Sequence, residues 1–206
     1  YDEGDRRFLR TMAENTAREI YVKKFLEPNL FLTGKASELK ADVRKRYCQA
    51  RLVFTDARAA DADTQWQLWE THSDRCCVLS SGGKESLLSF ALLEELRQSK
   101  DPVVREVHPI FVNESGRHWF TAVNAHRDFQ KRYPLTERVW VNSDRVFAWM
   151  LRQLPFVRSD FATLRSDEYP IRLWTVAIFI FAVLPLMRNR GLGRLIVGDE
   201  FDTSVR

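Results

Sequence analysis

The sequence has little cysteine, and its three cysteines lack the spacing of a disulfide framework or a zinc site. Cys76 and Cys77 are adjacent within an apolar stretch, so we interpret them as buried strand residues in a reducing compartment. A secretory signal is also missing. These absences together predict a cytoplasmic protein.

Long apolar runs are absent as well. The apolar stretch at residues 171–187 has an uninterrupted core from Leu173 to Leu184, which is shorter than the roughly 20 residues that a membrane-spanning helix needs. We therefore predict a fully buried helix here and no membrane span.

The chain also lacks a large excess of one charge, because 32 Lys and Arg against 28 Asp and Glu leave a net charge of +4. This balance suits an anionic small-molecule ligand and does not require nucleic acid as a partner. The 206 residues, 45% of them apolar, suffice for one α/β domain with an appendage. The sequence starts at Tyr1 and stops at Arg206 directly after a candidate site loop, so we expect a segment of a longer protein.

Strand-like and helix-like segments alternate from residue 71 onward, which predicts a three-layer α/β/α fold with a mainly parallel twisted sheet. Residues 1–70 instead predict a helical appendage, with an exposed helix over 1–27 and a second helix over 38–50. The predicted strands lie near residues 76–79, 103–112, 139–141 and 195–197, and the helices between them near 86–99, 117–132 and 146–154.

Two familiar phosphate-binding motifs are missing, namely G-x-G-x-x-G and the Walker A loop. The chain nevertheless carries Gly82-Gly83-Lys84 between a short apolar strand and an apolar helix, which we expect to pack buried on the sheet. Glycines let a backbone approach an anion closely, and the unpaired N–H groups and dipole of a helix start favour negative charge. The stretch therefore predicts a phosphate or pyrophosphate site; the alternative is an ordinary turn with a solvated lysine.

The string from Ser81 to Ser86 resembles the pyrophosphate-binding loop of the ATP pyrophosphatase superfamily, usually Ser-Gly-Gly-x-Asp-Ser. Glu85 stands where that family has Asp. The resemblance implies a nucleotide-binding domain of the HUP type over residues 71–206 and an enzyme that cleaves ATP to AMP and pyrophosphate while adenylating a substrate oxygen. The implied loop contacts are Ser80, Ser81, Gly82, Gly83, Lys84, Glu85 and Ser86.

Polar residues follow each predicted strand, and ligands of parallel sheets bind at the carboxyl ends of strands. The superfamily implies that the end of the second strand contacts the adenosine, through Phe111, Val112 and Asn113. An acidic run after the last strand would repel pyrophosphate, so we predict a bridging Mg²⁺; the alternative is a solvated acidic turn. The candidate metal ligands are Asp199, Glu200 and Asp202.

Two further pairs of residues allow either a structural or a functional interpretation. Glu168 and Arg172 are four residues apart, so they either pair along a helix or leave Arg172 to bind a carboxylate or phosphate. His118 and His126 share a helix face without a third ligand at zinc spacing, which favours structural roles. His118 is the better functional candidate of the two because it lies nearer a strand end.

Five strings together are similar to the bacterial UDP-N-acetylmuramoyl-L-alanyl-L-glutamate epimerases, over about residues 75–206. They are residues 81–86, 113–119, 142–145, 167–174 and 198–202. The resemblance implies that ATP adenylates the α-carboxylate of the terminal L-Glu of UDP-MurNAc-L-Ala-L-Glu, which acidifies the adjacent Cα–H. A base then removes this proton, another returns on the opposite face, and hydrolysis releases AMP and the D-glutamyl product. The implied catalytic residues are His118, Glu168 and Asp144 for proton transfer, with Lys84 and Arg172 binding anionic groups.

Two other functions fit the same residues. One is another adenylating enzyme of the superfamily, either an amidotransferase-like synthetase or a tRNA-modifying enzyme. The tRNA version predicts a basic domain or CxxC pairs, which the sequence lacks. The other is a non-catalytic module that binds adenine nucleotides without releasing pyrophosphate.

Overall fold

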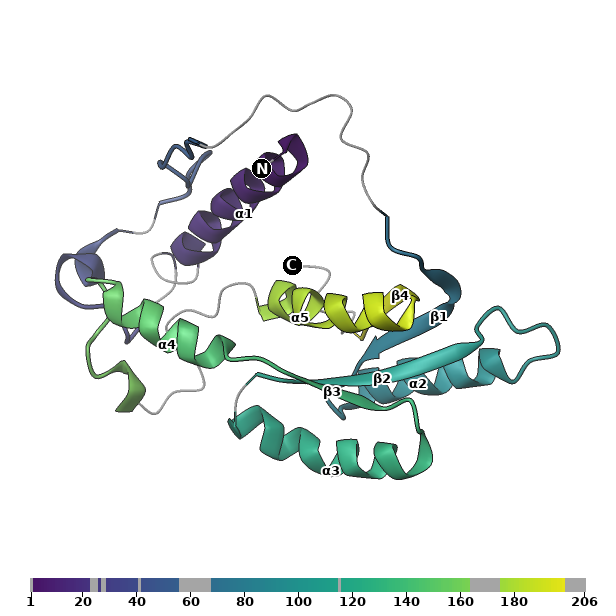
Figure 1. Cartoon of the computed structure of the whole chain (residues 1–206). Helices are drawn as coiled ribbons and strands as arrows, with labels where there is room; N and C mark the ends of the chain where they lie inside the picture. Colours follow the sequence, from purple (N-terminus) through teal and green to yellow (C-terminus); the bar gives the residue numbers. More distant parts are fainter. Residues whose placement is uncertain are drawn as a thin grey trace. The chain divides into compact units, whose positions relative to one another are not determined.

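The structure is a computed structural model that describes residues 2–22, 26, 29–40, 42–55, 68–114, 116–163 and 175–198, with the backbone alone at 116–118 and 175 (Figure 1). Its helices are α1 (Glu3–Tyr21), α2 (Lys84–Arg97), α3 (Gly116–Arg132), α4 (Ser143–Gln153) and α5 (Thr175–Arg190), with 3-10 helices η2 (Gly34–Glu38) and η3 (Phe161–Thr163). Its strands are β1 (His72–Leu79), β2 (Glu106–Asn113), β3 (Glu137–Trp140) and β4 (Leu192–Val197).

The four strands form one all-parallel sheet in the order β3-β2-β1-β4. Leu79 at the end of β1 is in register with Ile110 on one side and Val197 on the other. The predicted α/β class with a parallel sheet flanked by helices is therefore confirmed, and the arrangement is compatible with three α/β/α layers.

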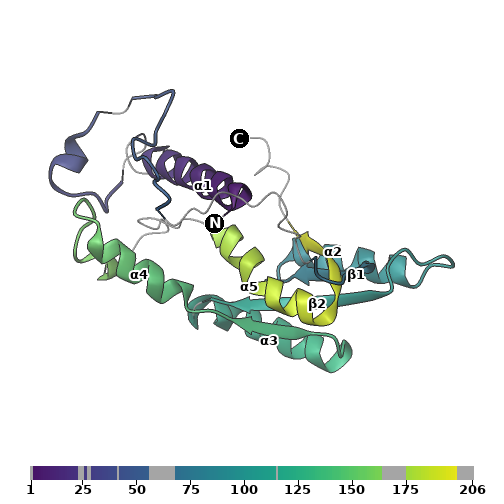
Figure 2. The same cartoon turned by 45° about the horizontal axis from the view of Figure 1, so that its top comes forward.

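Strand alternation divides the core between the two faces of the sheet. Cys76 and Val78 pack with Phe90 of α2 and with α3, whereas Cys77 packs with Val183 of α5 on the other face. Figures 1 and 2 show α3 and α5 on opposite sides of the sheet. Cys76 and Cys77 are both fully buried, so the interpretation of this pair as strand residues is confirmed.

The order of connections locates the switch point of the sheet. The chain steps from β1 to β2 to β3 with α2 and α3 on one face, then returns to β4 with α5 on the other. Adjacent strands β1 and β4 thus have connections leaving in opposite directions, which opens a crevice at their carboxyl ends in folds of this kind.

Two helices are less buried than the sequence predicted. In α2, Phe90 and Ser86 are buried, but Leu88 and Leu92 are 61% and 52% exposed. In α5, Val183 and Met187 face the sheet while Phe181 is 53% exposed, so the prediction of a fully buried helix is wrong for the described part of residues 171–187. The reason is geometric, since a helix on a sheet buries one face and the described chain provides no further layer over the other.

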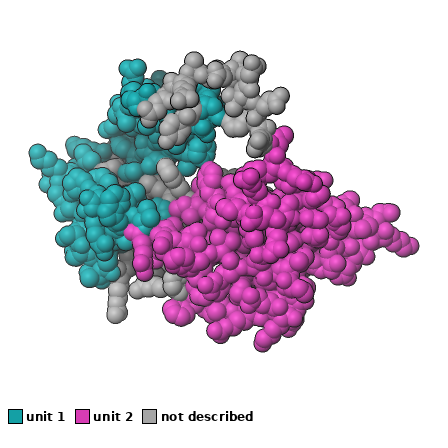
Figure 3. Space-filling model, viewed as in Figure 1, with its two compact units in different colours: residues 1–67, 146–175 teal, residues 68–145, 176–206 magenta. Residues whose placement is uncertain are grey.

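The chain divides into two compact units, residues 1–67 with 146–175 and residues 68–145 with 176–206 (Figure 3). The first contains α1, which begins with a capping box between Asp2 and Asp5. Its small core includes Leu151 and Val157. The predicted division at residue 70 into two domains stays a prediction.

The predicted helix over residues 38–50 is wrong. Only η2 forms there, and the described residues from 42 to 50 lie without helix or strand. Leu39 and Val43 are 56% and 81% exposed, so this segment has no apolar stripe that packing could turn into a stable helix.

No helix in the described ranges is long and apolar enough to cross a membrane.

The packing of α2 can be tested with a pair of substitutions. The Phe90 ring contacts Tyr133 and Phe129 at centroid distances of 4.6 and 5.0 Å, so Phe90→Ala should lower the free energy of unfolding by about 3–5 kcal/mol. Leu92→Ala is the control and should cost about 0.5 kcal/mol because its side chain is exposed. Urea unfolding measures both, and equal losses would contradict the orientation of α2.

Candidate functional site

The loop from Ser80 to Gly83 joins β1 to α2 through a backbone that glycine alone adopts easily. Gly82 has φ +79°, and a Cβ placed on it would lie 2.7 Å from the Cβ of Ala125 on α3. The turn is therefore held against α3 and cannot accept a side chain without displacement. Gly83, with φ −83°, is the N-cap of α2.

Serine hydroxyls fix the shape of this loop. Ser80 Oγ accepts the N–H of Gly82 at 3.3 Å, and Ser81 Oγ accepts the N–H of Gly83 at 3.3 Å. Ser86 Oγ donates to the Gly83 carbonyl at 3.0 Å. Ser80 N–H donates to the Ile110 carbonyl at 2.9 Å, which ties the start of the loop to β2. The loop is thus ordered by its own side chains before any ligand binds.

The start of α2 keeps its capacity to bind an anion. No side chain caps the helix at Gly83, so its first-turn N–H groups point outward. The Lys84 side chain is 84% exposed, with its Nζ 3.4 Å from Glu85 Oε1. Glu85 in the first turn supplies negative charge to the helix start in the absence of a ligand.

Gly198, directly after β4, lies against this helix start. A Cβ on Gly198 would be 3.0 Å from the backbone carbon of Glu85 and 3.1 Å from the backbone nitrogen of Ser86. The chain therefore leaves β4 within van der Waals distance of the first turn of α2. This close approach of Gly198 was not predicted from the sequence. The signal that could have indicated it is a glycine directly after a strand. The candidate metal ligands Asp199, Glu200 and Asp202 come next and lie outside the described residues.

β2 ends at the same carboxyl edge of the sheet, on the other side of β1 from β4. β2 continues three residues beyond Ile110, the partner of Leu79, to Asn113, which is 8% exposed. Phe111 is fully buried beneath α3, so its ring belongs to the core, while Val112 faces the α5 side. Glu114 follows, 5% exposed, and is a buried carboxylate at this edge.

For the remaining candidate catalytic residues, the structure describes the whole residue, its backbone alone, or neither. Asp144 is exposed in the first turn of α4, and its Oδ1 accepts the N–H of Arg145 at 2.9 Å. It follows β3, two strands from β1, and so about 10 Å along the carboxyl edge. His118 lies in the first turn of α3, with its backbone alone described. Glu168 and Arg172 lie outside the described residues.

His126 is a core residue of α3. Its ring packs against Phe111 and Trp119 at centroid distances of 5.2 and 5.1 Å. Burial lowers its pKa below the usual value, and the nearby charges of Arg138 and Arg127 lower that pKa further. Both effects disfavour the charged form of the imidazole, which suits a packed side chain.

The described residues bring Ser80–Ser86, Asn113 and Gly198 to the carboxyl ends of adjacent strands, and Asp144 to the same edge farther away. Backbone N–H groups, hydroxyls and one lysine can hold an anion there. Within the described ranges, no three His, Cys, Asp or Glu side chains gather as a cation site.

Comparisons of the chain with protein-family models, curated proteins and solved structures found no match.

The constraint on Gly82 can be tested by substitution. Gly82→Ala should destabilise the protein by about 1–2 kcal/mol from its left-handed backbone, and further through the contact with Ala125. Gly83→Ala is the matched control, because its φ is negative and its new Cβ would meet only side-chain oxygens, Ser81 Oγ at 3.2 Å and Glu85 Oε2 at 3.8 Å.

Adding Ala125→Gly to Gly82→Ala should restore the stability lost through the contact between the two Cβ atoms. The loss caused by the left-handed backbone should remain. Urea unfolding of the four proteins gives the coupling energy between the two positions. A coupling energy near zero would show that Gly82 does not pack against Ala125 of α3.

Proposed function

We propose that this protein binds ATP at the β1–α2 loop, cleaves it between the α and β phosphates, and uses the adenylate to activate a substrate carboxylate. The observation that carries the proposal is the Gly82-Gly83 turn, which opens an uncapped helix at the switch point between β1 and β4. An anion with several oxygens suits this turn because the outward N–H groups, the Ser81 hydroxyl and Lys84 can all donate hydrogen bonds.

The chain's own groups would divide the work of the cleavage. Backbone N–H groups at the start of α2 would hold the β and γ phosphates, and Lys84 would compensate charge that grows on the leaving pyrophosphate. The high exposure of Lys84 leaves its amine able to move toward a ligand. Ser80 and Ser86 keep the turn in place, since their hydroxyls lie 3.4 Å apart beneath it.

The predicted Mg²⁺ fits the charge balance of this proposal. Asp199, Glu200 and Asp202 would hold the ion, and its charge would offset their repulsion of the pyrophosphate. These residues follow Gly198, which lies against the loop.

The specific reaction that we propose is the epimerisation of the terminal L-Glu of UDP-MurNAc-L-Ala-L-Glu. Support for this substrate comes from the sequence resemblance. His118, Asp144 and Glu168 are the candidates for moving the Cα proton, and Arg172 is a candidate for binding a substrate carboxylate. An acyl adenylate makes this proton transfer feasible because the enolate no longer carries a second full negative charge.

The experiment supplies the protein with ATP, Mg²⁺ and UDP-MurNAc-L-Ala-L-Glu and follows pyrophosphate release and the chirality of glutamate. We expect pyrophosphate, AMP and D-glutamate to appear together. Lys84→Ala should slow pyrophosphate release by about 10²–10³-fold, as the loss of one charge-stabilising donor does. Lys100→Ala, which removes an exposed lysine beyond the other end of α2, is the control and should leave the rate unchanged.

The outcomes separate the competing functions. Pyrophosphate without D-glutamate would leave another adenylating enzyme, and nucleotide binding without pyrophosphate release would leave the non-catalytic module. An unchanged rate in Lys84→Ala would contradict the role of the loop.

A further inference from the structure

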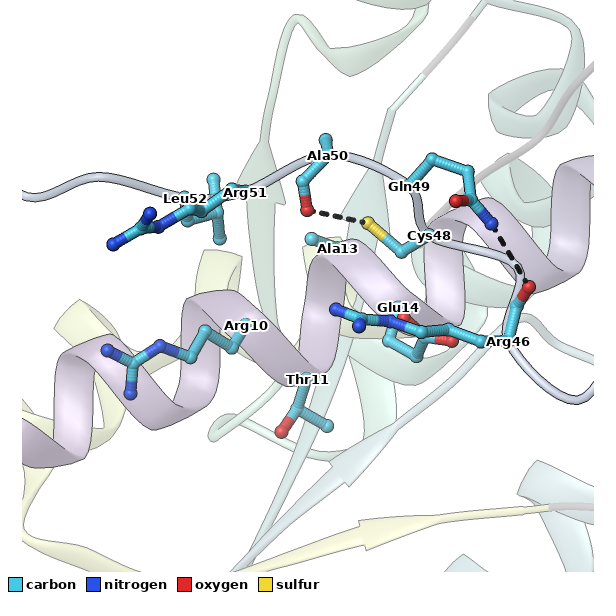
Figure 4. A pocket seen from close by; sticks show the side chains of 10 residues that line it. All are labelled: Arg10, Thr11, Ala13, Glu14, Arg46, Cys48, Gln49, Ala50, Arg51 and Leu52. Carbon is cyan, nitrogen blue, oxygen red and sulfur yellow. Dashed lines mark hydrogen bonds between the residues drawn. The ribbon is translucent and has the colours of Figure 1, made fainter.

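A second concave site lies in the unit formed by residues 1–67 and 146–175, between α1 and the segment 42–55 (Figure 4). The cavity has a volume of about 690 Å³. One wall is a face of α1. The other is a non-helical stretch that includes residues for which the sequence predicted a helix. The lining residues used below are Arg10, Glu14, Arg46, Cys48, Gln49 and Arg51.

Aromatic and charged contacts hold the second wall along α1. At one end, the Tyr47 ring packs against Tyr21 at 5.2 Å, and the Tyr47 N–H donates to Glu14 Oε1 at 3.3 Å. At the other end, the Arg10 guanidinium lies 5.6 Å from the centre of the Phe54 ring. The segment therefore runs antiparallel to α1 and is fixed on both sides of the cavity.

The cavity has an excess of positive charge. Arg10, Arg46 and Arg51 line it, and Glu14 is its one acidic lining residue. The Glu14 carboxylate already accepts the Tyr47 N–H, and Arg10 lies 3.4 Å from Glu3. Neither Arg46 nor Arg51 has an ion-pair partner among the described residues. Figure 4 shows the three guanidinium groups extending from the two walls toward the same side of the cavity.

We propose that this cavity binds the phosphate groups of a small molecule such as a nucleotide or a sugar diphosphate. Guanidinium groups bind phosphate oxygens through paired hydrogen bonds, and two arginines without ion-pair partners supply them here. A volume of about 690 Å³ is that of a small-molecule site. The Gln49 amide on the second wall donates to the Arg46 carbonyl at 3.4 Å and has a second N–H beyond this bond. This site shares no residue with the phosphate loop and goes beyond the function proposed above.

Cys48 offers a local readout of this cavity. It lines the site half-buried, whereas Cys76 and Cys77 are fully buried and burial raises the pKa of Cys77 to about 12. A neutral alkylating reagent, iodoacetamide, therefore reacts at Cys48 first, and mass spectrometry gives the rate. The experiment measures this rate in the whole protein with pyrophosphate, UDP or ATP, against sodium chloride at equal ionic strength.

Pyrophosphate should slow alkylation of Cys48 about tenfold at ten times its half-maximal concentration, as simple occupancy requires. The double variant Arg46→Gln/Arg51→Gln should lose this protection. The matched control, Arg7→Gln/Arg18→Gln, removes two exposed α1 arginines outside the lining and should keep it. Thermal unfolding of each variant verifies that it is folded.

Protection that persists in Lys84→Ala supports a site independent of the phosphate loop, and its loss there would overturn the proposal. The proposal is also overturned if none of the three anions protects Cys48, or if the Arg46/Arg51 variant is protected as well as the parent protein. Protection by single-stranded RNA but not by pyrophosphate would assign the surface to nucleic acid instead. Protection by UDP or ATP beyond that by pyrophosphate would identify the ligand as a nucleotide.

Discussion

The close contact between Gly82 and α3 is the constraint on which the candidate site depends. Only a residue without a Cβ fits this turn easily, because φ is positive and a Cβ would lie 2.7 Å from that of Ala125. This contact fixes where α2 starts, and the start of α2 fixes the direction of its outward N–H groups. Gly198 completes the arrangement from the opposite side, since β4 ends against the same helix start.

The parallel sheet explains why these glycines meet. Leu79 is in register with Ile110 and Val197, so the segments that follow three strands reach one edge together. The core on both faces supports the edge, with Phe90 and Phe111 on the α2–α3 side and Val183 on the α5 side. A turn that is already ordered at a rigid sheet end favours ligand binding there, because its donors need not reorganise.

The sequence predicted the sheet well and the helix surfaces poorly. Strands such as Cys76–Leu79 are recognisable because their apolar residues leave no polar face, and Gly82-Gly83 marks the turn that follows. The exposure of Leu88 and Leu92 was not predictable, because a leucine-rich helix looks the same whether one face or two are covered. The helix expected over residues 38–50 does not form because Leu39 and Val43 lie exposed instead of in a packed apolar stripe, and the non-helical segment found there lines the cavity around Arg46. The contact of Gly198 with Glu85 depends on strand order, which no local pattern encodes.

The most direct measurement of the central claim is a two-dimensional ¹⁵N–¹H spectrum of the protein titrated with ATP. We expect saturable shifts at the amides of Gly83, Lys84 and Glu85, together with that of Gly198, because these groups surround the proposed position of the phosphates. Unchanged resonances at these four amides in the presence of saturating ATP would contradict this claim.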